Sequence, residues 1–223
     1  MSEKSKSNLL RDQLAARASA PSKAAQTRSA ILDAGRDFLD TNPFRNLTVG
    51  TLMAVTGYSR SAFYQHFNDL HGLMEALLDQ VKDGIVQGAQ PWFVGEGDPV
   101  ATLQESLTAL VDVGYEHGSI LRAVSDAAPS DDRLEYVWQA FLGSFDEIVA
   151  ARIQEDQERG LTPEFDPMPV AHALNRMDAG VLIQAFGTGK TTSKEDVLSG
   201  IMRVWLSTLY PFDAASAIQQ KQE

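Results

Sequence analysis

The sequence predicts an all-α protein of about nine helices, with three short helices near its N-terminal end and a larger helical region after them. Three observations predict this class. Apolar residues recur at helical spacing along most of the 223 residues. Helix N-caps and glycine or proline breaks separate the periodic segments. No segment alternates convincingly between apolar and polar residues, and no internal repeat is found.

The first helix is predicted over residues 22–41. Its apolar residues recur at helical spacing and are Ala30, Ile31, Ala34, Phe38 and Leu39. Asn42-Pro43 ends this helix, because the residue before a proline is pushed out of the helical conformation. Residues 1–22 are polar and rich in Ser, Ala, Lys and Arg, so they are expected to form a disordered basic arm.

Two short helices with clear boundary signals come next. Thr48 is the expected N-cap of a helix that Gly57 ends, since glycine is the usual residue just after a helix. Ser59 is the expected N-cap of a second short helix, which reaches about residue 66. The tight spacing predicts a helix-turn-helix unit at residues 48–67.

The remaining elements are longer. Asp69 should cap a fourth helix that continues to about residue 90, where Pro91 breaks it. Asp98-Pro99 is a good start for the next helix, because proline suits the first helical position. From there we expect helices near residues 99–116, 119–126, 131–159, 167–186 and 194–210.

Charge is distributed unevenly along the chain. The net charge of −11 argues at first against a nucleic-acid partner, whose phosphates repel acidic proteins. However, residues 1–70 hold nine Lys/Arg and six Asp/Glu, whereas residues 71–223 hold ten and twenty-four. The excess of positive charge lies within residues 1–23, and residues 24–70 are neutral overall. The two regions are therefore expected to have different tasks.

Several function classes have little support. The chain has no cysteine, and its four histidines are dispersed without metal-ligand spacing, so we expect no metal ion, no cofactor and no catalytic residues. No apolar run approaches the roughly 20 residues of a membrane span, and a cytoplasmic location is expected. The run Gly187–Thr192 is similar to part of a phosphate loop, but Gln184 stands where the first glycine is needed.

The helix-turn-helix predicts double-stranded DNA as a partner. The major groove is about 12 Å wide and accepts one helix, which here is the one that Ser59 opens. Ala62, Phe63 and Phe67 are expected on its buried side. The side chains on its free side can all form hydrogen bonds and are Ser59, Arg60, Ser61, Tyr64 and Gln65. The alternative is that this aromatic cluster is an ordinary turn of the core.

Residues 48–49 and 57–67 resemble the helix-turn-helix of the tetracycline-repressor (TetR) family of bacterial one-component regulators, above all in the Tyr-x-His-Phe ending. The resemblance implies contacts to the DNA backbone or to base edges. The complete predicted DNA-binding set is Thr48, Ser59, Arg60, Ser61, Tyr64, Gln65 and His66. The family usually opens its next helix with a phosphate-binding lysine. This chain has Leu70 followed by His71, so one phosphate contact is in doubt and the basic arm is expected to compensate.

The C-terminal region resembles one mycobacterial repressor of that family over segments 137–138, 157–160, 173–178 and 204–210. That repressor holds elongated, mostly apolar ligands in a channel along its helices. The resemblance places these residues near such a channel: Leu103, Leu107, Leu110, Trp138, Leu142, Phe145, Val149, Asn175, Asp178 and Trp205. Their spacing is equally typical of core stripes on two helices. Asp178 replaces a neutral amide, so we expect it to favour a ligand with a hydrogen-bond donor or positive charge.

These inferences predict a TetR-family regulator that acts as a repressor. It would bind a palindromic operator as a homodimer, formed by the last two helices, and be released by a hydrophobic small-molecule effector. The expected parts are a disordered basic arm at 1–22, a helix-turn-helix DNA-binding domain with its linking fourth helix at 23–90, a helical ligand-binding and dimerisation domain at 91–212, and a polar tail at 213–223. The alternative is a helical protein-interaction adaptor with no regulated DNA binding.

Overall fold

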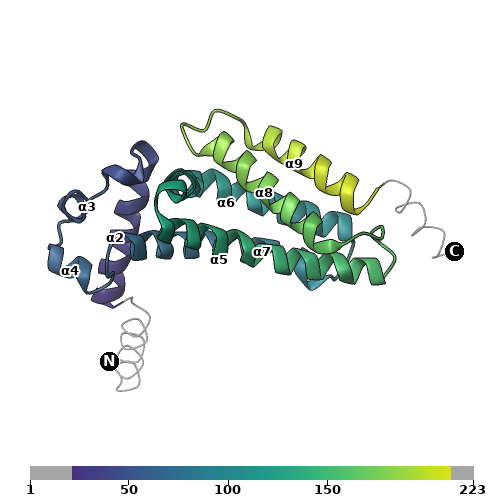
Figure 1. The fold of residues 1–223 in the computed structure, drawn as a ribbon, viewed down its shortest axis with the longest axis horizontal. Helices are drawn as coiled ribbons and strands as arrows, with labels where there is room; N and C mark the ends of the chain where they lie inside the picture. The colour runs from purple at the N-terminus through teal and green to yellow at the C-terminus, as the bar shows by residue number, and fades with distance from the viewer. Residues whose placement is uncertain (1–21, 212–223) are drawn as a thin grey trace, which may run out of the picture.

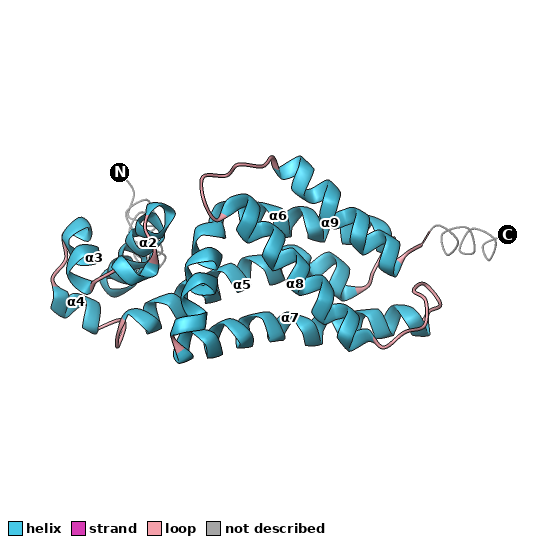
Figure 2. Ribbon diagram, turned by 45° about the horizontal axis from the view of Figure 1, so that its top comes forward, coloured by secondary structure: helices cyan, strands magenta, loops and turns pink. Residues whose placement is uncertain are grey.

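The computed structural model describes residues 22–211, and every regular element in that range is helical (Figure 2). The predicted arm at 1–22 and tail at 213–223 lie outside the described residues, apart from Ser22. The α-helices are α2 (Lys23–Thr41), α3 (Val49–Thr56), α4 (Arg60–Tyr64), α5 (Leu70–Val94), α6 (Pro99–Ala127), α7 (Asp132–Glu158), α8 (Pro167–Phe186) and α9 (Lys194–Leu209). A 3₁₀ turn η1 (Phe44–Asn46) lies between α2 and α3, and a second, η2 (Ala128–Ser130), lies between α6 and α7.

The molecule is elongated (Figure 1). Helices α2, α3 and α4 gather at one end, and α5–α9 form a bundle that extends away from them. α5 and α6 pack extensively on each other, as do α7 and α8, while α9 lies along α6 and α8. α5 starts beside the short helices and runs into the bundle, a path of roughly 37 Å at 1.5 Å per residue. One rigid helix therefore joins the two ends of the molecule.

The predicted caps form the short helices. The Thr48 side chain accepts a hydrogen bond from the Thr51 amide, and Thr51 returns one to the Thr48 amide, which makes a capping box. Gly57 adopts a left-handed conformation with φ 72°, which ends α3 without steric cost. The side chains of Ser59 and Asp69 cap α4 and α5 by accepting a hydrogen bond from the amide three residues ahead. Each boundary signal in this part of the sequence was correct.

The N-terminal helices do not have a core of their own. One cluster of buried apolar side chains runs without interruption from Ile31 in α2 through Phe63 in α4 and Leu77 in α5 to Phe145 in α7. A second cluster fills the far half of the bundle around Trp92 and Trp205. Movement of the bundle side chains can therefore be transmitted to α2–α4 by direct packing.

The two helices predicted at 99–116 and 119–126 are one continuous helix, α6. Gly118, which lies in the gap between the two expected helices, serves close packing. A Cβ atom at this position would lie only 2.7 Å from the carbonyl carbon of Phe186 in α8. The glycine therefore lets two helices approach closely, and the cost of a glycine inside a helix is offset by that contact.

Pro91 likewise does not end its helix. α5 continues through Pro91 to Val94 and stops at Gly95, which has a φ of 75°. The last turn is held by tertiary packing, since Trp92 is buried and its indole nitrogen donates a hydrogen bond of 3.0 Å to the Tyr210 hydroxyl. These contacts outweigh the one backbone hydrogen bond that a proline cannot form.

Candidate DNA-binding surface and effector cavity

The helix-turn-helix presents its polar residues outward. Phe63 in α4 and Phe67 just after it are both buried, and their ring centroids lie 5.5 Å apart. They form the inner side of this segment, as predicted. Tyr64, between them in sequence, is 60% exposed. The other predicted DNA-binding side chains are also exposed, except that His66 is intermediate: Thr48, Ser59, Arg60, Ser61 and Gln65. The core-turn interpretation thus applies to the two phenylalanines and not to Tyr64.

Arg60 lies across the start of α3. A Cβ atom added to Gly50 would come within 2.6 Å of its Nη2 atom. The guanidinium group therefore occupies space that only glycine leaves open, close to the N-terminal end of α3 and to Thr48. From this position Arg60 is available to a phosphate or a base edge, since it forms no salt bridge with any residue in the range 22–211.

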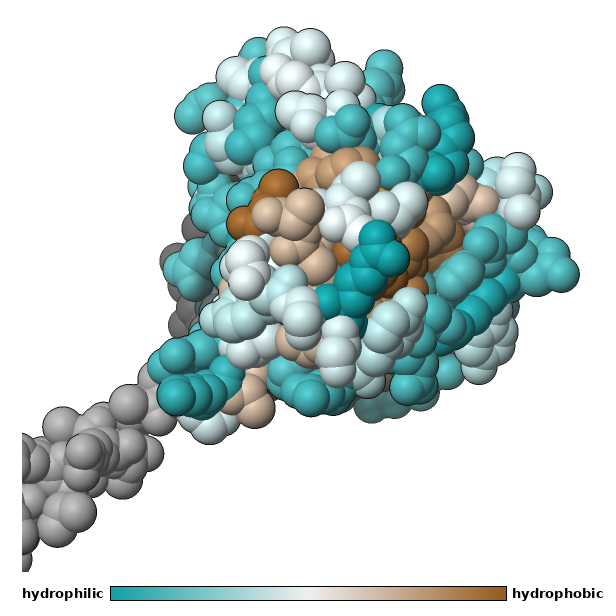
Figure 3. All heavy atoms as spheres, turned by 90° about the vertical axis from the view of Figure 1, so that its left-hand side faces the viewer, coloured by the Kyte–Doolittle hydropathy of each residue, from teal (hydrophilic) through white to brown (hydrophobic). Residues whose placement is uncertain are grey.

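The surface around α3 and α4 is mostly polar, with a smaller apolar area near its middle (Figure 3). Val55, Tyr58 and Tyr64 are exposed large apolar or aromatic residues on or beside these helices. Residues 24–70 carry no net charge. The described surface thus offers mainly hydrogen-bonding groups and only a few positive charges, among them the Arg60 guanidinium.

The start of α5 is fixed to α7 by charged groups. Arg133 binds Asp69 at 2.7 Å and Glu75 at 2.9 Å, and His71 Nε2 lies 2.7 Å from Asp131, the N-cap of α7. Hydrogen bonding to His71 is the main cause that lowers the pKa of Asp131. His71 therefore faces a carboxylate in this structure and does not replace the phosphate-binding lysine that the family usually has.

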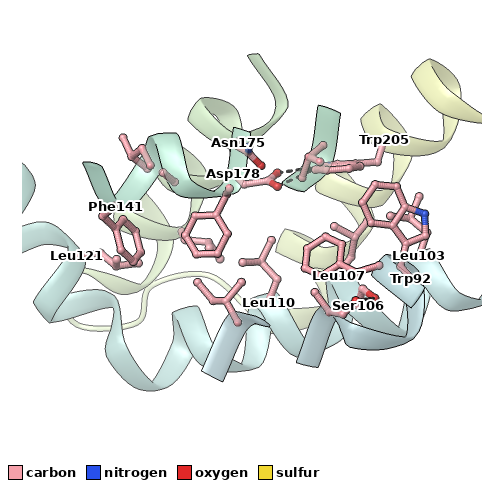
Figure 4. A pocket seen from close by; sticks show the side chains of 18 residues that line it. Trp92, Leu103, Ser106, Leu107, Leu110, Leu121, Phe141, Asn175, Asp178 and Trp205 are labelled. Carbon is pink, nitrogen blue, oxygen red and sulfur yellow. Dashed lines mark hydrogen bonds between the residues drawn. The ribbon is translucent and has the colours of Figure 1, made fainter. Parts of the chain in front are cut away.

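A cavity of about 80 Å³ lies inside the bundle, where the two core clusters meet (Figure 4). Its walls come from α5, α6, α7, α8 and α9, and they are almost entirely apolar. Nine of the ten residues predicted for a ligand channel line it: Leu103, Leu107, Leu110, Leu142, Phe145, Val149, Asn175, Asp178 and Trp205. The helix stripes that also suited a plain core therefore surround an internal space.

Trp138 is the exception. It does not line the cavity but stacks on Phe141, with ring centroids 5.5 Å apart and planes inclined by 13°. The apolar stripe on α7 extends beyond the cavity. Its first residue, Trp138, therefore contacts the wall residue Phe141 instead of the cavity itself. Sequence analysis did not identify the other lining residues, which are Ile85, Ala89, Trp92, Phe93, Ser106, Leu121, Phe141, Ala179 and Leu182.

Asp178 is a buried carboxyl in this apolar wall. It is 4% exposed, and its two oxygens accept a hydrogen bond from Trp205 Nε1 at 3.2 and 3.1 Å (Figure 4). Desolvation by burial raises the pKa of Asp178 from 3.8 to about 7, and the Trp205 hydrogen bond opposes this only in part. No cationic side chain among residues 22–211 forms a salt bridge with it.

The nearby cationic side chain, Arg176, forms its salt bridge with a different carboxylate. Arg176 Nη1 lies 2.9 and 3.0 Å from the two oxygens of Asp146 on α7. Asp146 also accepts a hydrogen bond of 2.8 Å from Asn175 Nδ2, and His172 Nδ1 lies 3.1 Å from it. The three groups on α8 thus bind Asp146 and leave Asp178 without a charged partner.

A buried polar network closes the far end of the cavity. Trp92 meets Trp205 edge to face, with ring centroids 5.7 Å apart, and is hydrogen-bonded to Tyr210. The Tyr210 hydroxyl donates to Asp156, whose other oxygen lies 2.7 Å from Arg152. Burial is the main cause that raises the pKa of Tyr210 well above its usual range, so this hydroxyl stays protonated as a donor. The network ties the ends of α5, α7 and α9 together.

Helix α6 connects the cavity with the DNA-binding end. Leu121 lines the cavity, while its neighbours Ser119 and Arg122 point to α2. Ser119 Oγ donates a hydrogen bond of 2.5 Å to Asp40, and Arg122 Nη2 donates one of 3.1 Å to the Leu39 carbonyl. A displacement of this part of α6 would therefore act directly on the C-terminal end of α2.

Comparisons with known proteins agree with this arrangement. Residues 103–211 match the family model described as "Transcriptional regulator EthR, C-terminal domain". The chain is 26% identical over 188 residues to the "HTH-type transcriptional regulator EthR" of Mycobacterium tuberculosis (strain CDC 1551 / Oshkosh), covering 81% of this chain and 86% of EthR. These comparisons support a TetR-family transcriptional regulator with an EthR-like C-terminal domain. The matched relative is named as a transcriptional regulator and not as an enzyme.

Solved structures show the same TetR-family fold. A putative TetR-family regulator from Syntrophomonas wolfei superimposes with a TM-score of 0.72 at 17% identity, covering 82% of this chain and 94% of that one. The SmeT–triclosan complex superimposes with a TM-score of 0.70 at 20% identity, covering 82% and 90%. Among residues 22–211 no helix is both long and apolar enough to cross a membrane.

Four of the nine cavity-lining residues that sequence reasoning missed share one property. Ile85, Ala89, Trp92 and Phe93 lie on α5, which was assigned to the DNA-binding part and ended at Pro91 in the prediction. Their helical spacing was visible in the sequence, but it did not show that the end of this helix enters the bundle.

Proposed function

We propose that this TetR-family regulator is a repressor that binds a palindromic operator as a homodimer and is released by a mostly apolar small molecule. The observation that carries the proposal is the internal apolar cavity whose wall residue Leu121 adjoins the hydrogen bonds from α6 to α2. An effector site and a DNA-binding unit that are both in contact with one helix can be linked by a coupling free energy, typically about 1–3 kcal/mol.

The exposed residues of α4 support the DNA-binding part of the proposal. Thr48, Arg60 and Tyr64 stand outward at one end of the molecule, where a major groove could receive α4. We assign the same role to the other four predicted residues, which share that surface: Ser59, Ser61, Gln65 and His66. Arg60 supplies the charge-assisted contact and the others supply hydrogen bonds.

The size of the cavity supports coupling. Pockets for drug-sized ligands commonly measure roughly 300–1,000 Å³, whereas this cavity measures about 80 Å³. An effector of ordinary size must therefore push wall side chains apart. Because the walls belong to a continuous packed core, part of this displacement reaches α6 and α2. The EthR-like C-terminal match and the triclosan-bound structural neighbour favour a small-molecule site here.

Dimerisation would use α8 and α9. These helices leave a groove between them that is lined by apolar residues such as Met177, Val181 and Val204. Val204, one of the residues that line this groove, is 39% exposed. Pairing two copies through this face would form a four-helix bundle and place two α4 helices for a two-fold operator.

Substitution of Arg60 or Tyr64 by alanine tests the DNA-binding assignment. Each change should weaken binding to the upstream region of the chain's own gene in a gel-shift assay, at fixed salt, and leave effector binding unchanged. Tyr136→Ala is a matched control, because Tyr136 is 76% exposed on α7 and is not part of α3 or α4. Normal operator affinity in both the Arg60 and the Tyr64 variant would overturn the assignment.

The coupling has its own test. Ser119→Ala removes the hydrogen bond to Asp40 and leaves both the cavity lining and α4 intact. The proposal expects effector binding to stay normal while the effector releases DNA less completely. Unchanged release at saturating effector would contradict transmission through this contact.

A helical protein-interaction adaptor remains the competing proposal. A chain of that kind would show no salt-dependent binding to its upstream region. Residues 1–20 add a further criterion, because residues 1–23 carry five Lys/Arg and two Asp/Glu. Their deletion should flatten the salt dependence of DNA binding more than it changes sequence preference. An unchanged salt slope would show that the arm does not supply the electrostatic affinity.

A further inference from the structure

The polar atoms that face the effector cavity are mainly acceptors. The cavity walls contain five side chains with a nitrogen or oxygen atom: Trp92, Ser106, Asn175, Asp178 and Trp205. Both indole N–H groups donate to protein acceptors, one to Tyr210 and the other to Asp178. The Ser106 hydroxyl donates to the backbone carbonyls of its own and the neighbouring helix.

Asn175 extends this pattern. Its amide nitrogen donates a hydrogen bond of 2.8 Å to Asp146, which fixes the orientation of the amide. Its amide oxygen forms no hydrogen bond with another residue in the range 22–211. Asp178 offers a carboxylate that has only Trp205 as a partner. A ligand that enters the cavity therefore meets two groups that can still accept hydrogen bonds. They lie three residues apart on one turn of α8.

We propose that the effector is a lipophilic amine, whose protonated nitrogen binds Asp178 and whose apolar body fills the rest of the cavity. This inference rests on the proposed effector role of the cavity. An ammonium group brings up to three donors and a positive charge to a carboxylate that has no cation. A neutral ligand would bring no charge to offset that of the carboxylate, and an anionic ligand would repel it.

The charge around the cavity favours the same ligand class. Among the eighteen wall residues from α5 to α9, Asp178 is the only titratable group. The nearest cation on α8, Arg176, binds Asp146 and does not compete for Asp178. Residues 71–223 carry ten Lys/Arg and twenty-four Asp/Glu, so the field of this region attracts cations and repels anions.

Proton release gives a second signature of the pair. Burial holds the pKa of Asp178 at about 7 in the free protein, and an adjacent ammonium group must lower that pKa. Below about pH 7 a bound amine should therefore expel a proton from Asp178. An alcohol of the same length carries no charge and should expel none. Trp205 on α9 donates to Asp178, and α5, α6 and α7 present no titratable group to it in the cavity wall.

Hexylamine, hexan-1-ol and hexanoate form a matched set of probes for the full-length protein. Titration calorimetry at pH 7.5 should show hexylamine binding at least about tenfold more tightly than hexan-1-ol, and hexanoate binding most weakly. In Asp178→Asn the amine preference should fall below about twofold. Asp112→Asn removes an exposed carboxylate that binds Lys194, so it is the control for net charge and should keep the preference.

The outcomes separate the two proposals. Equal or tighter binding of hexan-1-ol or hexanoate to the wild-type protein would overturn the amine inference and keep the cavity as an effector site. Binding of none of the three probes would contradict the effector site itself. Calorimetry at pH 6.5 in buffers of different ionisation enthalpy must show proton release with hexylamine and none with hexan-1-ol. This measurement needs no variant, so it decides the inference even if Asp178→Asn fails to fold.

Discussion

Substitution of Asp178 by asparagine should stabilise the folded protein, and increasingly so at higher pH. Burial raises the pKa of this carboxyl from 3.8 to about 7, a change of roughly three units. At about 1.36 kcal/mol per unit, the ionised side chain costs the fold about 4 kcal/mol. An asparagine at the same position can still accept the Trp205 hydrogen bond and carries no charge.

The direction of the pH dependence follows from proton binding. Between pH 3.8 and about 7 the folded state keeps a proton on Asp178 that the unfolded state has lost. The free energy of unfolding therefore falls as pH rises through this range and levels off above it. In Asp178→Asn this contribution is absent, so the stability difference between variant and wild type should grow by about 2–3 kcal/mol from pH 5 to pH 8.

Urea unfolding monitored by tryptophan fluorescence measures this difference. Protein concentration must be the same throughout, because an oligomer gains apparent stability with concentration. Asp146→Asn is the matched control with the opposite expectation. Asp146 is bound by Arg176 and Asn175, so its neutralisation should destabilise the fold by about 1–3 kcal/mol. A stability difference for Asp178→Asn that stays constant from pH 5 to pH 8 would refute the reasoning.

Two further predictions concern glycines that leave space for a neighbour. Gly118→Ala should destabilise the fold by about 1–3 kcal/mol in thermal unfolding, because the added Cβ would lie 2.7 Å from the backbone of Phe186. Gly143→Ala is the control: a Cβ there would have nothing within 4 Å, so this change should be neutral or stabilising. Gly50→Ala should keep the fold but weaken operator binding several-fold in a gel shift, because its Cβ would displace the Arg60 guanidinium. A further loss in an Arg60→Ala background would show that Gly50 acts by another route.

The DNA-binding end was predicted in detail because its signals are local. Thr48, Ser59 and Asp69 cap the helices that follow them, and a cap needs only the next three residues of the chain. Gly57 ends α3 through its own backbone conformation. The division of α4 into a buried phenylalanine face and an exposed Tyr64 follows from helical periodicity alone.

The cavity was predicted only through a resemblance, and incompletely. Helical spacing shows that Leu103 and Leu107 share one face, but a buried face looks the same in sequence whether it meets a neighbour or an empty space. That distinction depends on how five helices pack at once. Trp138 shows the limit, since it continues the stripe of Leu142 and Phe145 and yet stacks behind the cavity wall.

By itself the sequence determined the helical class, the caps, the helix-turn-helix and the unequal distribution of charge, because each depends on residues a few positions apart. Tertiary structure decided that α5 continues past Pro91 and that α6 is unbroken at Gly118, because packing outweighed local preference at both positions. It also decided that Arg176 binds Asp146 and leaves Asp178 alone. Which partner a buried charge finds depends on the helices around it, and the sequence of one helix does not contain that information.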